Sequence, residues 1–370
     1  MGLAFELGWQ SLRRRPGQFL APIFVAAATT LVVLCASGFY LGMLDATVAW
    51  TNTLPGDLVV VATEGNPGMM QAYSDIPDET VEAVRAALPD AAVHPLVGQR
   101  AWLWRNGQDA WAYVVGIHPN DTFGLPLRVI AGRARPKIGE IVVDEVVARD
   151  LRVGIGDTIK VRAATLHVVG IATGSNNVIG TIAFVSRATM ALAGVPRPTH
   201  LFVAVAPGAD VASVAARLAT IPGVRTITRA AFDDSTRSLP RQIFRPVIGV
   251  IDSVTIAMAA LVIAVVLRST SMERRAEFGL LRALGVPRRV IAGSVVWATA
   301  LATGGGTGVG VAAAAALAVL LQHVEPRFVW AMPWRLLVSV VLSVIGVGLL
   351  AALQPVRVVG RTDPALVLRV

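Results

Sequence analysis

The sequence predicts an α-helical membrane protein with four transmembrane helices, and with one extracytoplasmic α+β domain inserted between the first and second helices. Three observations support this 1+3 arrangement. The mean hydropathy is +0.63 and only 15% of residues are charged, compared with about 25% in soluble domains. Four apolar runs come close to or exceed the roughly 20 residues that cross a bilayer. About 200 residues of mixed polar sequence separate the first run from the second.

The four apolar runs predict transmembrane segments at residues 19–44, 243–268, 290–321 and 336–354. The first run has 26 residues, far more than the 7–15 apolar residues of a signal peptide, so we expect a retained span. Apart from Arg245 and Arg268 at the ends of the second segment, the only charge within the runs is Asp252. An ionisable residue deep in a bilayer is a functional candidate, whereas one near the outer interface can simply reach water. Both readings of Asp252 stay open.

Basic residues predict the orientation of the spans. Arginines gather in the lead at residues 1–18, around the segment 269–289 and in the tail at 355–370, while the short loop 322–335 carries only two. Because Lys and Arg favour the cytoplasmic side, we expect a multi-pass protein of the bacterial inner (cytoplasmic) membrane. Both termini and the segment 269–289 would then lie in the cytoplasm, and residues 45–242 outside.

The same partition explains the net charge of +9, since the segments assigned to the cytoplasm hold +8 of it. The basicity therefore reflects membrane topology, and nucleic acid is not expected as a partner.

The outer domain, residues 45–242, reads as two β-α-β units around a β-rich insert at about 118–199. Strand-like runs at 101–105 and 110–117 flank the turn Asn106-Gly107 and predict a hairpin. Its alternating aromatic residues form either a core or dimer contact, or a surface for an apolar substrate or a protein partner: Trp102, Trp104, Trp111 and Tyr113.

No pattern of an active site is found in the sequence. The five histidines lack metal-ligand spacing, and neither a G-x-S-x-G motif nor a G-x-x-x-x-G-K-[ST] phosphate loop is present. We therefore expect no catalytic residues, no bound metal and no cofactor. The third run holds a cluster of glycines that allow close helix approach within the subunit or in a dimer: Gly304, Gly305, Gly306, Gly308 and Gly310.

Residues 271–290, SMERRAEFGLLRALGVPRRV, predict a short amphipathic helix between the second and third spans. Gly285 provides a C-cap, and Pro287 ends the helix. The physical pattern alone fits a helix lying in lipid headgroups and a helix docking on a cytoplasmic partner equally well. Its apolar stripe follows the spacing i, i+3, i+4, i+7, i+8: Ala276, Gly279, Leu280, Ala283 and Leu284, broadened by Phe278 and Leu281.

The string MERRAEFGLLRALGVPRRVI resembles the coupling helix of the MacB/FtsX/LolC-like permeases, the type VII ABC transporter family. Three further stretches are similar to this family: the lead at residues 7–19, in which Trp9-Gln10 replace the usual Arg-Asn; the outer-domain block at 139–170; and the tail QPVRVVGRTDPALVLR at 354–369. The coupling string and the tail are the more specific of these.

The resemblance implies a permease subunit whose coupling helix and first two spans transmit ATPase motion to the outer domain. Such a permease exports or extracts a lipid, a peptide or another amphiphile. ATP and Mg would bind to two copies of a separate ATPase. The permease would pair with a second copy of itself or with a paralogous permease. Carried over by position, the ATPase-docking residues are Glu273, Arg274, Glu277, Phe278, Leu281 and Arg282.

Two further points stay open at this stage. The alternative function is an FtsX-like signal transmitter, which would activate an extracytoplasmic cell-wall hydrolase. A periplasmic adaptor or an extracellular hydrolase would accordingly be an additional partner.

Overall fold

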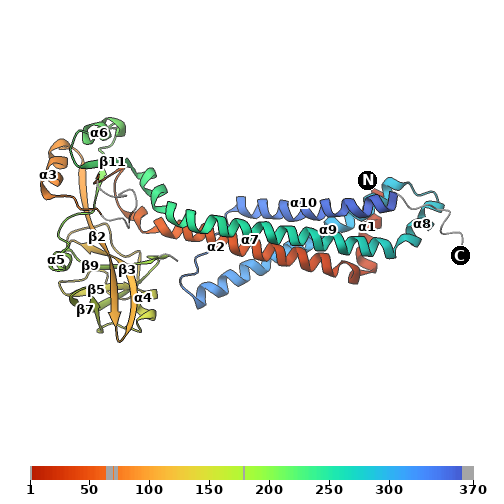
Figure 1. Cartoon of the computed structure of the whole chain (residues 1–370), viewed down its shortest axis with the longest axis horizontal. Coiled ribbons are helices and arrows are strands. Elements are labelled where there is room, and N and C mark those ends of the chain that lie inside the picture. Colours follow the sequence, from red (N-terminus) through yellow and green to blue (C-terminus); the bar gives the residue numbers. More distant parts are fainter. Residues whose placement is uncertain (1, 64–69, 71–73, 178–179, 361–370) are drawn as a thin grey trace. The chain divides into compact units, whose positions relative to one another are not determined.

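The computed structural model describes residues 2–63, 70, 74–177 and 180–360, which form two compact units. The helical unit comprises the chain up to Gly42, Phe244–Val324 and the chain from Trp330. The outer unit comprises Met43–Ile243 and Glu325–Val329. Figure 1 shows long helices in the first and strands with short helices in the second.

Seven helical segments build the helical unit, two of which, α2 and α7, continue into the outer unit. They are α1 (Gly2–Arg14), η1 (Pro16–Phe19), α2 (Leu20–Ala49), α7 (Arg229–Glu273), α8 (Arg275–Ala283), α9 (Arg288–Val324) and α10 (Trp334–Gly360). The last part of the predicted tail, residues 361–370, lies outside the described residues.

Four stretches of the described chain are long and apolar enough to cross a membrane: Pro16–Thr53, Arg229–Glu273, Arg288–Val324 and Trp334–Leu353. Helix α7 has 45 residues, which at 1.5 Å per residue is about 68 Å, more than twice the hydrocarbon thickness of roughly 30 Å. It begins at Arg229, well before the expected start of the second span at 243. One continuous helix thus serves as both the candidate span and the connection to the outer unit.

Two glycines of the predicted cluster let α9 pack closely against α2. A Cβ atom added to Gly306 would lie 2.3 Å from the carbonyl oxygen of Ile23, and one added to Gly310 would lie 2.5 Å from that of Ala27. Small residues commonly permit such contacts between membrane helices. The other three glycines would meet no described atom within 4 Å: Gly304, Gly305 and Gly308.

The outer unit contains an eleven-stranded sheet with short helices. Its strands are β1 (Leu58–Ala62), β2 (Ala92–Arg105), β3 (Gln108–Ile117), β4 (Arg128–Gly132), β5 (Glu140–Asp144), β6 (Thr158–Val161), β7 (Ala164–Thr173), β8 (Asn176–Asn177), β9 (Gly180–Ser186), β10 (His200–Ala204) and β11 (Val224–Thr228). Its helices are η2 (Thr51–Thr53), α3 (Asp78–Ala87), α4 (Glu145–Asp150), α5 (Arg187–Leu192) and α6 (Val211–Leu218).

Strand β2 joins two parts of the sheet, whose order is β11-β1-β10-β2-β3-β9-β5-β7-β4. The first residues of β2 pair with β10, from Ala92 to Leu96, and the later ones pair with β3, from Val97 to Arg105. The β-rich part therefore begins within β2 rather than near residue 118. Strand β6 pairs with both β2 and β7 and closes this part further.

Each part of the sheet has its own cluster of buried aliphatic side chains, and a third cluster, rich in aromatic residues, contains residues of both parts. Helices α3 and α6 cover one face of β1 and β10, where Val84 and Leu218 pack with Leu201. In the β-rich part, Leu103 and Ile141 are fully buried in a cluster that includes residues of α4 and α5. Period-two alternation along the strands places these side chains on the inner face.

The predicted hairpin is confirmed, because Asn106 and Gly107 form the turn between β2 and β3 with φ angles of 47° and 79°. Two positive φ values favour an Asn-Gly pair. The aromatic set is divided: Trp102 and Trp104 are 52% and 48% exposed, whereas Tyr113 is buried. Trp102 and Trp104 thus offer a surface, Trp111 is half-buried, and Tyr113 belongs to the core.

A short segment between α9 and α10 also belongs to the outer unit. Within it, Glu325 pairs with Arg149, and Arg327 pairs with Asp150, so that both partners lie at the end of α4. All four side chains are at least one third exposed. Exposed ion pairs contribute about 0–1 kcal/mol each, so this attachment is a weak and reversible one.

Asp144 combines a capping role with complete burial. Its carboxylate accepts hydrogen bonds from the Val146 amide at 3.0 Å and from the Asn176 side chain at 3.2 Å. Burial nevertheless raises the pKa of Asp144 to about 6, from an ordinary value of 3.8. The folded state therefore binds this proton more tightly than the unfolded state does. The carboxyl's contribution to the free energy of unfolding falls as the pH rises from about 4 to about 6.

We expect Asp144→Asn to stabilise the β5–α4 region at pH 7 by up to ~3 kcal/mol, because asparagine keeps the cap without the buried charge. Amide hydrogen exchange of β5 and α4, corrected for intrinsic rates, measures this between pH 4 and 7. Protection in the parent should decline with rising pH, and in the variant it should not. Identical pH profiles would contradict the assignment.

Gly310→Val should destabilise the helical unit by about 1–3 kcal/mol, the usual cost of overpacking, since its Cβ would meet the Ala27 carbonyl oxygen of α2 at 2.5 Å. Gly304→Val is the matched control, because no described atom lies within 4 Å of its Cβ position. Thermal aggregation in mild detergent, followed by size-exclusion chromatography, compares the two. Equal loss of stability in both variants would contradict close packing of Gly310 against α2.

Candidate functional site

The segment between α7 and α9 is bounded by two local backbone features. Helix α7 ends at Glu273, and Arg274 leaves the helical geometry with φ −92° and ψ 8° before α8 begins. At the other end, Gly285 has φ +85°. The Gly285 amide donates to the carbonyl of Arg282, and the Val286 amide donates to that of Leu281, both at 3.0 Å. This is the Schellman pattern, so Gly285 ends α8 as the sequence predicts.

Charged side chains attach α8 to the N-terminal lead. The Glu277 carboxylate pairs with Arg15 at 2.6 Å and with Arg274 at 3.0 Å. Arg274 also donates to the Ser11 hydroxyl at 3.2 Å. Partial burial works to raise the pKa of Glu277, but the hydrogen bonds and charges of the two arginines outweigh it and lower the pKa. Glu277 therefore stays ionised and holds the lead, α7 and α8 together.

The aromatic residue of the motif packs inward. Phe278 is 3% exposed and fills a cluster with Ile291 at the start of α9, which Leu281 partly joins. The Arg274 guanidinium lies over the Phe278 ring, 5.4 Å from its centre, a favourable cation–π arrangement. Phe278 thus fixes α8 on α9 and is not an exposed anchor.

An apolar stripe on the other side of α8 remains uncovered. Leu280 is 60% exposed and Leu284 is 72% exposed. Ala276 and Ala283 are exposed beside them, and the spacing i, i+4, i+7, i+8 places all four on one face. We call these four residues the α8 stripe. The sequence shows that the stripe is apolar. The docking residues, however, were predicted from the motif and did not include Leu280 and Leu284.

The six residues predicted for docking therefore differ in accessibility. Glu273 is exposed, Leu281 and Arg282 are half-buried, Arg274 and Glu277 bind each other, and Phe278 is buried. The structure brings them together on one short segment, and the burial of Phe278 orients the α8 stripe outward.

Asp252 lies on α7 and contacts α2. One carboxylate oxygen accepts a hydrogen bond from the Ser37 hydroxyl at 2.7 Å. The other oxygen is buried without a partner among the described residues. This acid is half-buried between two candidate spans.

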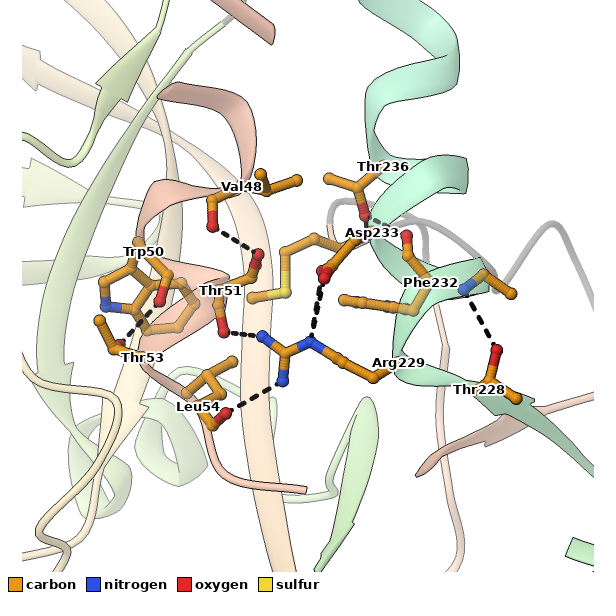
Figure 2. Close-up of polar contacts among 12 residues, drawn as sticks. Val48, Trp50, Thr51, Thr53, Leu54, Thr228, Arg229, Phe232, Asp233 and Thr236 are labelled. Carbon is orange, nitrogen blue, oxygen red and sulfur yellow. Dashed lines mark hydrogen bonds and ion pairs between the residues drawn. The ribbon is translucent and has the colours of Figure 1, made fainter. Parts of the chain in front are cut away.

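A second polar cluster joins the two helices that enter the outer unit (Figure 2). Arg229, the first residue of α7, donates to the carbonyl oxygens of Leu54 at 3.0 Å and of Thr51. It also pairs with Asp233 one turn later, at 3.3 Å. Both Thr51 and Leu54 follow the last turn of α2. We call this arrangement the Arg229 connector.

Aromatic residues bury the Arg229 connector. Trp50 is 1% exposed and donates from its indole to the carbonyl of Leu125 at 3.0 Å, while Phe232 is fully buried. Phe202 lies beneath the Arg229 guanidinium, 5.4 Å from it. Sequence reasoning did not single out Arg229. Asp234 is exposed, but its neighbour Asp233 is only 16% exposed.

Comparison with known proteins identifies both halves of the chain. The family model described as MacB-like periplasmic core domain matches residues 23–221, and that described as FtsX-like permease C-terminal matches residues 250–364. The first match alone covers more than half of the chain.

Relatives at the sequence level are uncharacterized ABC transporter permeases of Mycobacterium. One from Mycobacterium tuberculosis (strain ATCC 25618 / H37Rv) is 29% identical over 252 residues, which is 66% of this chain and 65% of the relative. Another from that strain is 27% identical over 314 residues, 83% of each chain.

Two solved structures share partial similarity with this chain. The extracellular domain of the noncanonic ABC-type transporter YknZ from Gram-positive bacteria is 13% identical with a TM-score of 0.35, over 46% of this chain and 100% of that one. The periplasmic region of MacB from Actinobacillus actinomycetemcomitans is 12% identical with a TM-score of 0.35, over 50% and 92%.

The family matches and the curated relatives agree with each other and with the resemblance of the α8 motif. The chain therefore belongs to the ABC transporter permeases that combine a MacB-like periplasmic core domain with an FtsX-like permease C-terminal region.

Proposed function

We propose that this permease works as a mechanotransmission subunit: a separate ATPase docks on α8, and its motion reaches the outer unit through α2 and α7. In this arrangement the four candidate spans cross the membrane in 1+3 order, with both termini and α8 in the cytoplasm. Two permease chains pair, and two ATPase subunits bind ATP and Mg. The transporter thereby exports or extracts an amphiphilic substrate.

The observation that carries the proposal is the exposed α8 stripe on a helix that is otherwise held in place. Large apolar side chains beside a charged rim are typical of protein interfaces, and the exposed Glu273 at that rim disfavours contact with anionic lipid headgroups. Glu273 and Arg282 flank the stripe and would add charge complementarity. Arg15 and Glu277 connect α8 to the lead, so a push on α8 would be passed on rather than absorbed.

The Arg229 connector supports the second half of the proposal. Its guanidinium holds the end of α2 and the start of α7 at one point, so both helices would move the outer unit together. Hydrogen bonds that involve a charged group contribute about 1.5–3 kcal/mol each. A connection of that strength transmits motion better than the exposed ion pairs elsewhere on the surface.

Leu284→Glu should reduce capture of the ATPase by tenfold or more, because an unpaired carboxylate in an apolar contact costs at least ~1.4 kcal/mol. The measurement is affinity purification of the tagged chain from its host in mild detergent, with quantification of co-purified ATPase and of ATP hydrolysis. Glu277 is a poorer target because its loss would also release Arg15 and Arg274.

Leu192→Glu is the matched control for this test, since Leu192 lies on α5 in the outer unit and is 79% exposed. It should leave capture unchanged. Undiminished capture by Leu284→Glu would show that the α8 stripe does not dock the ATPase. Failure of the parent to capture any ATPase in several detergents would refute the docking proposal as a whole.

Arg229→Lys should uncouple the outer unit without affecting docking. Lysine keeps the charge but cannot reach two carbonyls and Asp233 with one planar group. Amide exchange at Thr53 and Leu54 should accelerate about tenfold, while ATPase capture stays at the parent level and ATP-dependent changes in the outer unit disappear. Arg225→Lys, at an exposed position of β11, is the control. Persistence of the ATP-dependent changes in Arg229→Lys would contradict the connector's role.

A further inference from the structure

A large cavity lies within the outer unit, and its lining shares no residue with the Arg229 connector. Its volume is about 1000 Å³, at the upper end of the usual range for small-molecule sites. Three segments form its wall: the residues after β3, the loop between β4 and β5, and α5. Apolar atoms of the wall come from Ala134, Pro136, Ile138, Ala188, Ala191 and Pro196.

The wall is cationic as well as apolar. Arg133, Arg135, Lys137 and Arg187 line it, and the described lining contains no aspartate or glutamate. Arg133 is neutralised by Glu140, and Arg135 donates to the carbonyls of Pro119 and Asp121. These two arginines therefore mainly fix the loop.

The other two cations keep unused binding capacity. No hydrogen bond or ion pair of the Lys137 ammonium is formed with the described residues, and its side chain is exposed. Arg187 donates to the carbonyl of Pro95 at 2.7 Å and lies 3.8 Å from Asp121, yet its buried Nε has no hydrogen-bond partner in the described chain. Arg187 also lines the cavity, and its ion pair with Asp121 is long, so its guanidinium can pair with an anionic group there.

Ile138 supplies the apolar counterpart. It is 65% exposed and follows Lys137 directly in the chain. An isoleucine that stays uncovered at the wall of a cavity gains hydrophobic stabilisation when a ligand buries it. The same wall thus offers apolar area for a hydrocarbon body and positive charge for a headgroup.

We propose that this cavity binds an anionic amphiphile, a molecule with one apolar chain and a carboxylate, sulfate or phosphate headgroup. The headgroup binds at Lys137 and Arg187, and the chain lies on Ile138 and the neighbouring alanines and prolines. That such a ligand is the transported substrate rests on the proposed function. Binding itself requires neither ATPase nor transport.

The chain contains only two lysines, Lys137 and Lys160, which provides an internal control. Lys160 lies on β6 and is not part of the cavity wall. The full chain in nanodiscs of neutral phosphatidylcholine is treated with an amine-reactive reagent, and labelling of each lysine is followed by mass spectrometry. The probes are dodecanoate, the uncharged dodecanol and acetate, which has the headgroup without the chain.

Dodecanoate should slow labelling of Lys137 several-fold and leave Lys160 unchanged, while dodecanol and acetate protect neither. Ala188→Trp, which fills the cavity, should abolish the protection; Ala216→Trp, at an exposed position of α6, should preserve it. No protection, equal protection by dodecanol or equal protection of Lys160 overturns the inference. Because the assay contains no ATPase, its result does not depend on whether an ATPase docks on α8.

Discussion

The structure depends on how one guanidinium joins the two helices that connect the helical unit with the outer unit. Carbonyls just beyond the last turn of α2 lie at the negative end of the helix dipole. Arg229 satisfies two of them and keeps its own charge balanced by Asp233. Trp50 and Phe232 are buried next to Thr51 and Asp233 in the chain, and the side chains of Arg229 and Asp233 are only 17% and 16% exposed. Strand β11 ends directly before Arg229, and β1 begins at Leu58, shortly after Leu54. The sheet therefore continues directly from the point that this side chain holds.

In the segment between α7 and α9, the motif residues and the exposed residues have different roles. The most recognisable residues, Arg274, Glu277 and Phe278, make internal contacts and fix the position of the helix. The less distinctive Leu280 and Leu284 remain at the surface. A docking element needs both properties, since an interface gains affinity when its apolar side chains are held in place beforehand. Motif residues therefore indicate where a site lies without all belonging to its contact surface.

Contacts within the outer unit differ in strength, and buried contacts are stronger than exposed ones. Its two aliphatic cores and the sheet hold it together, whereas the attachment of the segment Glu325–Val329 to α4 relies on exposed ion pairs. Such pairs form and break at little cost. The cavity beside α5 lies in the same unit and combines exposed Ile138 with cations. The buried cores and the sheet hold its wall in place, while its surface stays exposed.

The sequence by itself determined the class of the chain, its four apolar helices, the Asn-Gly hairpin and the short helix ended by Gly285, because hydropathy, spacing and turn chemistry act locally. It could not show that α7 starts at Arg229, since Pro240, Pro246 and several charges interrupt the apolar pattern there. Nor could it separate Gly306 and Gly310 from their neighbours, or Phe278 from Leu280. Those distinctions depend on which face of a helix meets another helix, and only tertiary packing decides that.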